Sequence, residues 1–193
     1  MPSARGTLDW SPAALHPELV APSVAAALAV AAAAAAAVAP DPVRDNGIAA
    51  AEVAPIDATL ADTEAFCAAY DVALAASANC VIVAGKRAGA TTYAAVMILA
   101  TDRADINGVV RKHLGVRKIS FAPHDDAVSL TGMEFGGITP IGLPAEWPVL
   151  VDAAVVAAGA VVIGSGLRRS KILVDGAALA ALPTAEVIDL AQH

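Results

Sequence analysis

A glycine-rich stretch in the second half of the chain holds the residues best suited to binding chemistry. Between Leu130 and Leu143 the sequence reads LTGMEFGGITPIGL, with four glycines and one proline. Glycine permits positive φ angles and close backbone approach, whereas proline fixes φ and removes one donor. This density predicts a shaped loop with exposed backbone N–H groups that can donate hydrogen bonds. An ordinary pair of tight turns is the alternative.

A second turn, Gly164-Ser165-Gly166, precedes three basic side chains: Arg168, Arg169 and Lys171. Charged residues on the edge of a sheet face solvent and discourage aggregation, which is the default interpretation. If this turn lies beside Gly136, the cluster would instead contact phosphate groups. The turn does not complete a dinucleotide fingerprint, because Arg169 replaces the third glycine and an extended run, KILV, follows.

Other catalytic patterns find little support in the sequence. It contains neither GxxxxGK[ST] nor GxSxG, so P-loop and hydrolase-elbow chemistry are not indicated. The four histidines have no metal-ligand spacing, and Asp125-Asp126 falls in the first turn of an expected helix, where carboxylates are favourable. Cys67 and Cys80 form no CxxC pair. We therefore expect no metal, no cofactor, no disulfide framework and a reduced cytoplasmic setting.

Composition and charge limit the classes of partner. The 193 residues suit one domain, or one domain with an appendage, and the net charge of −7 argues against broad binding to nucleic acid, including DNA. The charge is uneven, since residues 86–118 hold seven bases and two acids, a local +5. A partner with a few phosphates fits that region.

One apolar run, Leu19–Ala39, is long enough to raise the question of a membrane segment. Alanine contributes little to insertion, and Pro22 and Ser23 interrupt the run. Asp9 and Glu18 precede it, which does not suit a signal peptide. We expect an alanine-rich helix of a soluble protein, capped by Ser23, and no contact with a membrane.

Hydrophobic patterning and turn residues predict an α+β fold with a mixed sheet. The expected helices span residues 23–38, 62–70, 102 or 105 to 115, 123–132 and 176–182. The expected strands span residues 52–56, 80–85 and 91–100 as a hairpin, 116–121, 149–156, 160–163 and 171–174. Turns are expected at residues 40–42 and 45–47.

The loop TGMEFGGITPIG, Thr131–Gly142, closely resembles the signature loop of the YbaK-like, prolyl-tRNA synthetase-associated editing domains. The resemblance continues through the strand from Val149, the turn GSGLRRSKI and the closing GAALAAL helix, and covers residues 50–190. It implies an α+β fold with a central mixed, partly barrel-like sheet and surrounding helices. Residues 1–48 would be an extension with the alanine-rich helix, and residues 49–193 the editing domain.

Members of that family hydrolyse the ester of wrongly charged tRNA, so the implied partner is the tRNA acceptor end. The GxxxP element, Gly136–Pro140, would line a pocket for the aminoacyl group and the terminal adenosine. Backbone N–H groups and a positioned water can hold a developing oxyanion without a strong base. The resemblance assigns catalysis to Gly136, Gly137, Thr139 and Asn79, and substrate binding to Ile138, Pro140, Gly142, Gly164, Ser165, Gly166 and Arg168. Small apolar walls would select a small amino acid by size.

One departure concerns a lysine that family members usually carry near the start of the hairpin's first strand. This chain has Asn79 there. An amide keeps hydrogen bonding but lacks the cation that would hold a phosphate or polarise the ester, and Lys86 or Lys112 would have to substitute. The turn at Gly164-Ser165-Gly166 also lacks a histidine found in some branches.

The leading hypothesis is therefore a free-standing aminoacyl-tRNA deacylase. The alternative is a catalytically silent relative that binds tRNA ends, aminoacyl groups or a protein partner. A third hypothesis is a hydrolase of small non-tRNA esters with the same pocket. The sequence names neither the amino acid nor the oligomeric state.

Overall fold

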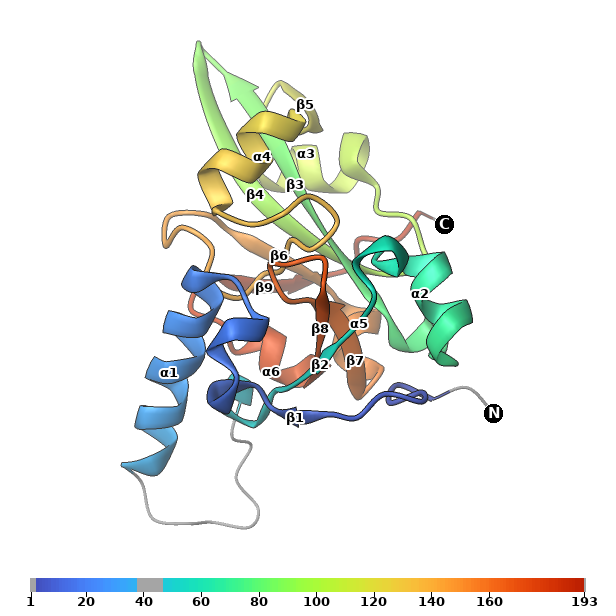
Figure 1. Cartoon of the computed structure of the whole chain (residues 1–193). Helices are drawn as coiled ribbons and strands as arrows, with labels where there is room; N and C mark the ends of the chain where they lie inside the picture. Colours follow the sequence, from blue (N-terminus) through green and yellow to red (C-terminus); the bar gives the residue numbers. More distant parts are fainter. Residues whose placement is uncertain (1–2, 38–46, 193) are drawn as a thin grey trace.

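The computed structural model describes residues 3–37 and 47–192, which form two β-sheets with helices around them (Figure 1). This architecture confirms the predicted α+β class. In chain order the main elements are β1 (Ser11–Pro12), α1 (Pro22–Ala36), β2 (Glu52–Pro55), α2 (Thr63–Tyr70), β3 (Ala78–Arg87), β4 (Ala90–Leu99), α3 (Arg111–His113), β5 (Lys118–Phe121), α4 (His124–Thr131), β6 (Val149–Asp152), α5 (Ala153–Ala157), β7 (Ala160–Gly164), β8 (Ser170–Asp175), α6 (Gly176–Ala180) and β9 (Ala185–Ile188).

The larger sheet is five-stranded and mixed, with the order β5-β3-β4-β6-β9. Strands β3 and β4 form the predicted hairpin and pair from Ala78 opposite Leu99 to Arg87 opposite Ala90. Strand β5 joins β3 antiparallel, whereas β6 joins β4 and β9 joins β6 in parallel. The run of small and β-branched residues in β3 and β4 suits these central, buried strands.

The smaller sheet is four-stranded and antiparallel, with the order β1-β2-β8-β7. It meets the larger sheet where Ser77, just before β3, bridges to Val162 of β7. Within the described residues the two sheets therefore form an open arrangement, and they do not close into one barrel. The mixed sheet was expected, but its division from a separate antiparallel sheet was not.

Helix α1 packs on the main core through Val24 and Leu28. It begins differently from the expectation, because Ala21 is the N-cap, Pro22 opens the helix, and the buried hydroxyl of Ser23 has no hydrogen-bond partner. The predicted cap by Ser23 is therefore wrong. The expected helix end at Val38 and the turns at residues 40–42 and 45–46 lie outside the described residues. Because nothing tests the proposed boundary at residues 48/49, it stays a prediction.

Two elements in the second half of the chain differ from the expected ones. The strand predicted for residues 149–156 ends at Asp152, whose carboxylate accepts a hydrogen bond from the N–H of Ala154 and starts α5. The same carboxylate accepts from the N–H of Leu190 and so ties down the chain after β9, a strand that was not predicted. In the described ranges, no helix combines the length and hydropathy that crossing a membrane requires.

The segment after β4 matches the expected helix in position but not in type. Asp105 caps a π-helical turn, Ile106–Val110, by accepting from the N–H groups of Gly108 and Val109. Pro123 is the N-cap of α4 and not its first residue, so the helix begins one residue later than expected, and Gly132 ends α4 with a φ of 66°. The glycine-rich loop therefore continues directly from the end of α4.

Candidate functional site

A pocket of about 560 Å³ lies between the two sheets, the start of α2, α4 and the glycine-rich loop. Strand β3 contributes one wall, and β7 and β8 contribute the opposite one. Most of the lining side chains are small or apolar. The polar and sulfur-bearing ones are Asp62, Thr63, Ser77, Asn79, Cys80, His124 and Lys171.

The glycine-rich loop docks on the turn at residues 164–166, as expected if the two motifs share a site. The N–H of Glu134 donates to the carbonyl of Gly166 at 2.9 Å, and the N–H of Gly166 donates to the carbonyl of Gly137 at 2.7 Å. A side chain at Gly137 would collide with the backbone of Leu167, and one at Gly164 would collide with the loop. Glycine is therefore required at both positions for the loop and the turn to approach each other.

The loop leaves some of its backbone donors unused. The N–H of Gly137 donates to the carbonyl of Glu134 at 2.9 Å, so it is already occupied. By contrast, the N–H groups of Gly136 and Ile138 make no hydrogen bond within residues 3–37 and 47–192, and both residues line the pocket. Gly136 has a φ of +84°, a conformation that disfavours a side chain. The pocket therefore borders two unpaired backbone donors.

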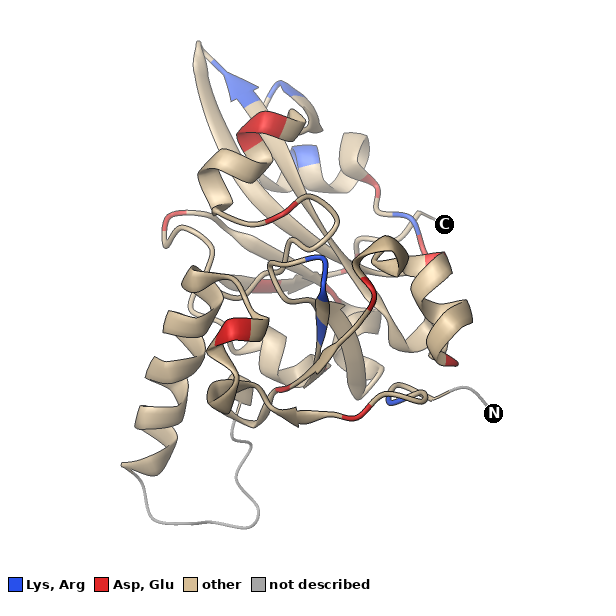
Figure 2. Ribbon diagram, in the orientation of Figure 1, with Lys and Arg blue, Asp and Glu red and all other residues tan. Residues whose placement is uncertain are grey.

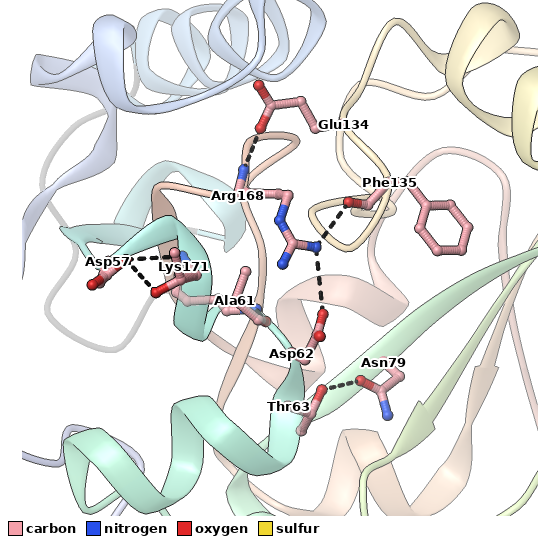
Figure 3. A network of polar contacts seen from close by, with 10 residues as sticks. Asp57, Ala61, Asp62, Thr63, Asn79, Glu134, Phe135, Arg168 and Lys171 are labelled. Atoms are coloured by element: carbon pink, nitrogen blue, oxygen red, sulfur yellow. Dashed lines mark hydrogen bonds and ion pairs between the residues drawn. The ribbon is translucent and has the colours of Figure 1, made fainter.

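Residues 61–63, at the start of α2, each form a hydrogen bond with one side chain of the site, and we call them the 61–63 segment (Figure 3). The carbonyl of Ala61 accepts from Lys171 Nζ at 2.7 Å. Asp62 Oδ1 accepts from Arg168 Nη1 at 3.4 Å, and Thr63 Oγ1 donates to Asn79 Oδ1 at 2.7 Å. Because the oxygen of the Asn79 amide is engaged, its two N–H donors are the part left for a ligand.

Arg168 lies across the glycine-rich loop. Its Nη1 donates to the carbonyl of Phe135 at 3.3 Å, and its backbone N–H donates to Glu134 Oε2 at 2.6 Å. A side chain at Gly136 would collide with the Arg168 guanidinium. The arginine thus joins the loop to the carboxylate of Asp62, although it does not itself line the pocket.

Lys171 lies in a different environment from the solvated sheet edge that the sequence predicted. It lies on β8, an interior strand between β2 and β7, so the interpretation as a solvated edge residue is wrong. Only 7% of Lys171 is exposed, and its Nζ lies 5.2 Å from the centre of the Phe66 ring. Burial lowers the pKa of Lys171 to about 8. Arg169, in contrast, is exposed and donates to the carbonyl of Glu18.

The structure brings only some of the predicted site residues together. Asn79, Gly136, Ile138 and Gly164 line the pocket. The other predicted residues do not line this pocket, and their roles stay predictions. Thr139 and Ser165 are fully buried, and Gly166 packs on Ala21. Pro140 and Gly142 border a second, apolar pocket of about 690 Å³ beside α1. Lys86 and Lys112 are exposed and do not line the pocket, so neither replaces the lysine missing at position 79.

Several pocket residues were missed by the sequence interpretation. Cys80 was considered only for disulfides and metals, yet its thiol borders the pocket, where burial raises its pKa to about 12 and keeps it protonated. His124 also lines the pocket and contacts the Phe135 ring at 4.7 Å between centroids. Among the described residues, no three His, Cys, Asp or Glu side chains gather as a set of metal ligands.

Comparison with known proteins places this fold and pocket in a family. Residues 57–182 match the family described as the aminoacyl-tRNA editing domain. No curated protein matches the chain.

Among solved structures, one proposed as a trans-editing enzyme for prolyl-tRNA synthetase has a TM-score of 0.69 and 18% identity, over 90% of this chain and 99% of its own. A scaffold protein from computational epitope grafting has a TM-score of 0.70 and 20% identity, over 90% and 97%. A protein described as hypothetical has a TM-score of 0.62 and 23% identity, over 72% and 86%. These likenesses concern the fold, whereas the family match covers more than half of the sequence. The chain therefore belongs to the YbaK-like family of aminoacyl-tRNA editing domains.

Proposed function

We propose that this protein is a cytoplasmic editing enzyme that hydrolyses the ester of a tRNA mischarged with a small amino acid. The observation that carries the proposal is the pair of unpaired N–H groups at Gly136 and Ile138 on the wall of a largely apolar pocket. Such donors stabilise the negative charge that develops on a carbonyl oxygen during ester hydrolysis. They are fixed before the substrate arrives because the loop is held on the turn at residues 164–166.

In the proposed reaction a water oxygen attacks the ester carbonyl carbon, and the carbonyl oxygen becomes an oxyanion near Gly136 and Ile138. The amide N–H groups of Asn79 offer further donors from the facing wall. When the intermediate collapses, the bond from the carbonyl carbon to the ribose oxygen breaks. One proton of the water passes to the ribose oxygen, the other is released to solvent, and the amino acid leaves as a carboxylate. No covalent intermediate with the protein is needed.

The lining of the pocket supports a preference for small amino acids. Ala61, Ala78, Ala122 and Ala127 contribute only methyl groups, while Ile82, Ile138 and Ile163 limit its width. A pocket of this kind excludes larger side chains by size and discriminates weakly among smaller ones. We also propose that residues 49–193 form the editing domain and that residues 1–48 are an extension.

Charge supports a nucleic-acid partner at one end of the molecule. Figure 2 shows lysines and arginines at the end of the β3–β4 hairpin, before β5 and in α3. They include Lys86, Arg87, Arg111, Lys112, Arg117 and, at the start of β5, Lys118, in a chain whose net charge is −7. A localised basic region in an acidic protein suits a few phosphates of one tRNA arm and does not suit broad binding to DNA.

The test is deacylation of tRNAs charged with alanine, serine, cysteine and proline by the natural protein and by Gly136→Ala. We expect hydrolysis of one of these substrates and its loss in Gly136→Ala, because the methyl group would displace Arg168 and the loop. Gly89→Ala is the matched control, since Gly89 has a φ of +86° but open space around it at the hairpin tip. No turnover of any of the four substrates by the natural protein would contradict the proposal.

The second candidate, a silent relative that binds tRNA ends without hydrolysing them, is favoured by Asn79, which takes the place of the usual lysine. It predicts tight binding of the acceptor stem with no turnover. Turnover of small esters that does not require the tRNA body would instead support the third hypothesis.

A further inference from the structure

The proposed reaction leaves one buried charged group of the pocket without a task. Lys171 lines the pocket, is 7% exposed, and makes one hydrogen bond, to the carbonyl of Ala61. It forms no ion pair with any residue in the described ranges. Its other close partner is the face of the Phe66 ring.

This environment stabilises a positive charge only in part. Removing an ammonium from water is costly unless the charge is paired and its donors are satisfied. A cation–π contact and one carbonyl offset some of this penalty. An ammonium has three N–H donors, so two are left without a described protein acceptor. The protein therefore keeps a cation with unused donors at the edge of a cavity, where a ligand oxygen would complete its coordination.

An aminoacyl-tRNA end offers phosphate oxygens, ribose oxygens and the ester carbonyl oxygen. Phosphates are strongly hydrated and stay close to solvent, where the 32% exposed side chain of Arg168 and the exposed Lys86 and Arg87 of the hairpin are available. Lys171 lies inside, among Phe66, Ala61 and Val162. The ester carbonyl belongs to the aminoacyl group, which the proposed function places in the pocket, and it is the oxygen that gains negative charge during hydrolysis.

We propose that Lys171 binds the ester carbonyl oxygen of the substrate and donates a hydrogen bond to the oxyanion formed when water attacks. This inference rests on the proposed function. Lys171 stays an ammonium throughout and transfers no proton, so the bond changes are those already given. Gly136 and Ile138 would donate to the same oxygen from the loop.

The structure also indicates a second position in the pocket from which an introduced lysine could replace Lys171. Lys171 and Asn79 come from different strands but contact the same 61–63 segment, through Ala61 and Thr63. A lysine introduced at position 79 would therefore bring an ammonium to the same part of the pocket. This gives a rescue experiment that a purely structural role of Lys171 would not satisfy.

The first experiment measures deacylation of the tRNA substrate against pH for the natural protein, Lys171→Met and the double variant Asn79→Lys/Lys171→Met. Loss of one oxyanion donor lowers the rate on the order of 100-fold, so we expect that loss in Lys171→Met and its recovery to within about tenfold in the double variant. We expect the rate of the natural protein to fall above about pH 8, where Lys171 loses its proton. Arg5→Met, at an exposed residue that does not line the pocket and lies outside the basic region of residues 86–118, is the control for removal of a positive charge.

The inference is overturned if folded Lys171→Met hydrolyses at the natural rate, or if the rate of the natural protein rises steadily through pH 9. It is also overturned if Lys171→Met is slow but the double variant stays equally slow, because a structural role would give that result. Thermal unfolding of each variant identifies any that fail to fold.

A second experiment does not depend on turnover. Titration calorimetry with 3′-alanylamino-3′-deoxyadenosine, in which an amide replaces the ester, measures binding directly. We expect about tenfold weaker binding by Lys171→Met, the equivalent of one hydrogen bond to a charged donor, and recovery in the double variant. Binding that depends on Lys171 without any deacylation would contradict the proposed function alone. Deacylation that ignores Lys171 would contradict this inference alone, and absence of both activities would overturn both.

Discussion

The two halves of the glycine-rich loop have different neighbours. Residues 132–138 dock on the turn at residues 164–166 and line the pocket with Gly136 and Ile138. Residues 139–143 lie under α1, where Ile141 is fully buried and Gly142 touches the backbone of Ser23. We call residues 132–138, which border the pocket, the chemical half of the loop, and residues 139–143, which pack under α1, its packing half. Residue types alone did not separate them, because glycine suits a ligand and a crowded backbone equally well.

The largest expected contrast comes from alanine at Gly136 and Gly142, two of the three positive-φ glycines of the loop. Gly136→Ala should reduce deacylation on the order of 100-fold, because small displacements of positioned donors are that costly. Gly142→Ala should instead lower the free energy of unfolding by roughly 2–3 kcal/mol, since φ is +78° and the methyl group would meet the backbone of α1. Single-turnover rates and urea unfolding measure the two effects. If Gly136→Ala and Gly142→Ala lowered the deacylation rate equally, the proposed difference in role between the two halves would be wrong.

The pH dependence of stability also distinguishes the pocket from the packing half of the loop, because the pocket contains the buried charge of Lys171. The pKa of Lys171 falls from 10.5 to about 8 in the folded protein, so the unfolded chain binds more protons between these values. Stability should therefore rise with pH through this window, by about 3 kcal/mol for this group. Urea unfolding of the natural protein and Lys171→Met at pH 7.5 and pH 10.5 measures the difference. The same pH dependence in both proteins would contradict the assignment.

Arg168 offers a smaller test of the chemical half. Arg168→Gln removes the contacts to Asp62 and the Phe135 carbonyl but leaves the backbone of the turn in place. We expect roughly a tenfold lower deacylation rate, because a partly exposed charged contact that orders the loop is worth about 1–2 kcal/mol. Arg169→Gln is the control, since Arg169 points to Glu18, away from the loop. Equal losses in both variants would indicate a general charge effect on tRNA binding.

The smallest effect is expected at Thr139, where the two halves meet. Its hydroxyl is buried and has no partner within the described residues. Thr139→Val should raise the free energy of unfolding by up to about 1 kcal/mol and change the rate less than twofold, because an unsatisfied hydroxyl is replaced by a methyl group of similar shape. A rate loss of tenfold or more would instead support the catalytic role that the family resemblance assigns to Thr139.

Local signals predicted much of the fold and the position of the site. The hairpin and the helix from Asp62 follow from strand patterning and caps, whereas the docking of the loop on the second turn was considered only as a condition. The run from Val149 to Val156 was misread because a short apolar run has no decisive period, and Asp152 ends the strand by capping α5. Strand β9 was missed because its pairing with β6 is parallel and non-local.

The functional charge of the pocket was harder to predict, for a physical reason. Lys171 is buried because α2 places Phe66 over it, and β8 lies between two other strands. Neither fact is encoded within a few residues of Lys171, so the sequence next to it indicates only a basic strand. The missing lysine at Asn79 could be read directly, whereas the lysine on the facing wall required the tertiary structure.

The 61–63 segment has a consequence for how the site can evolve. Adjacent residues there contact Lys171, Arg168 and Asn79, which come from two separate parts of the chain, β3 and the segment that leads into and begins β8. Deleting or inserting a single residue before α2 would change all three partners together, so the contacts are inherited as a set. Substitutions at the three partners should therefore show strong epistasis, while substitutions elsewhere on α2 should combine additively.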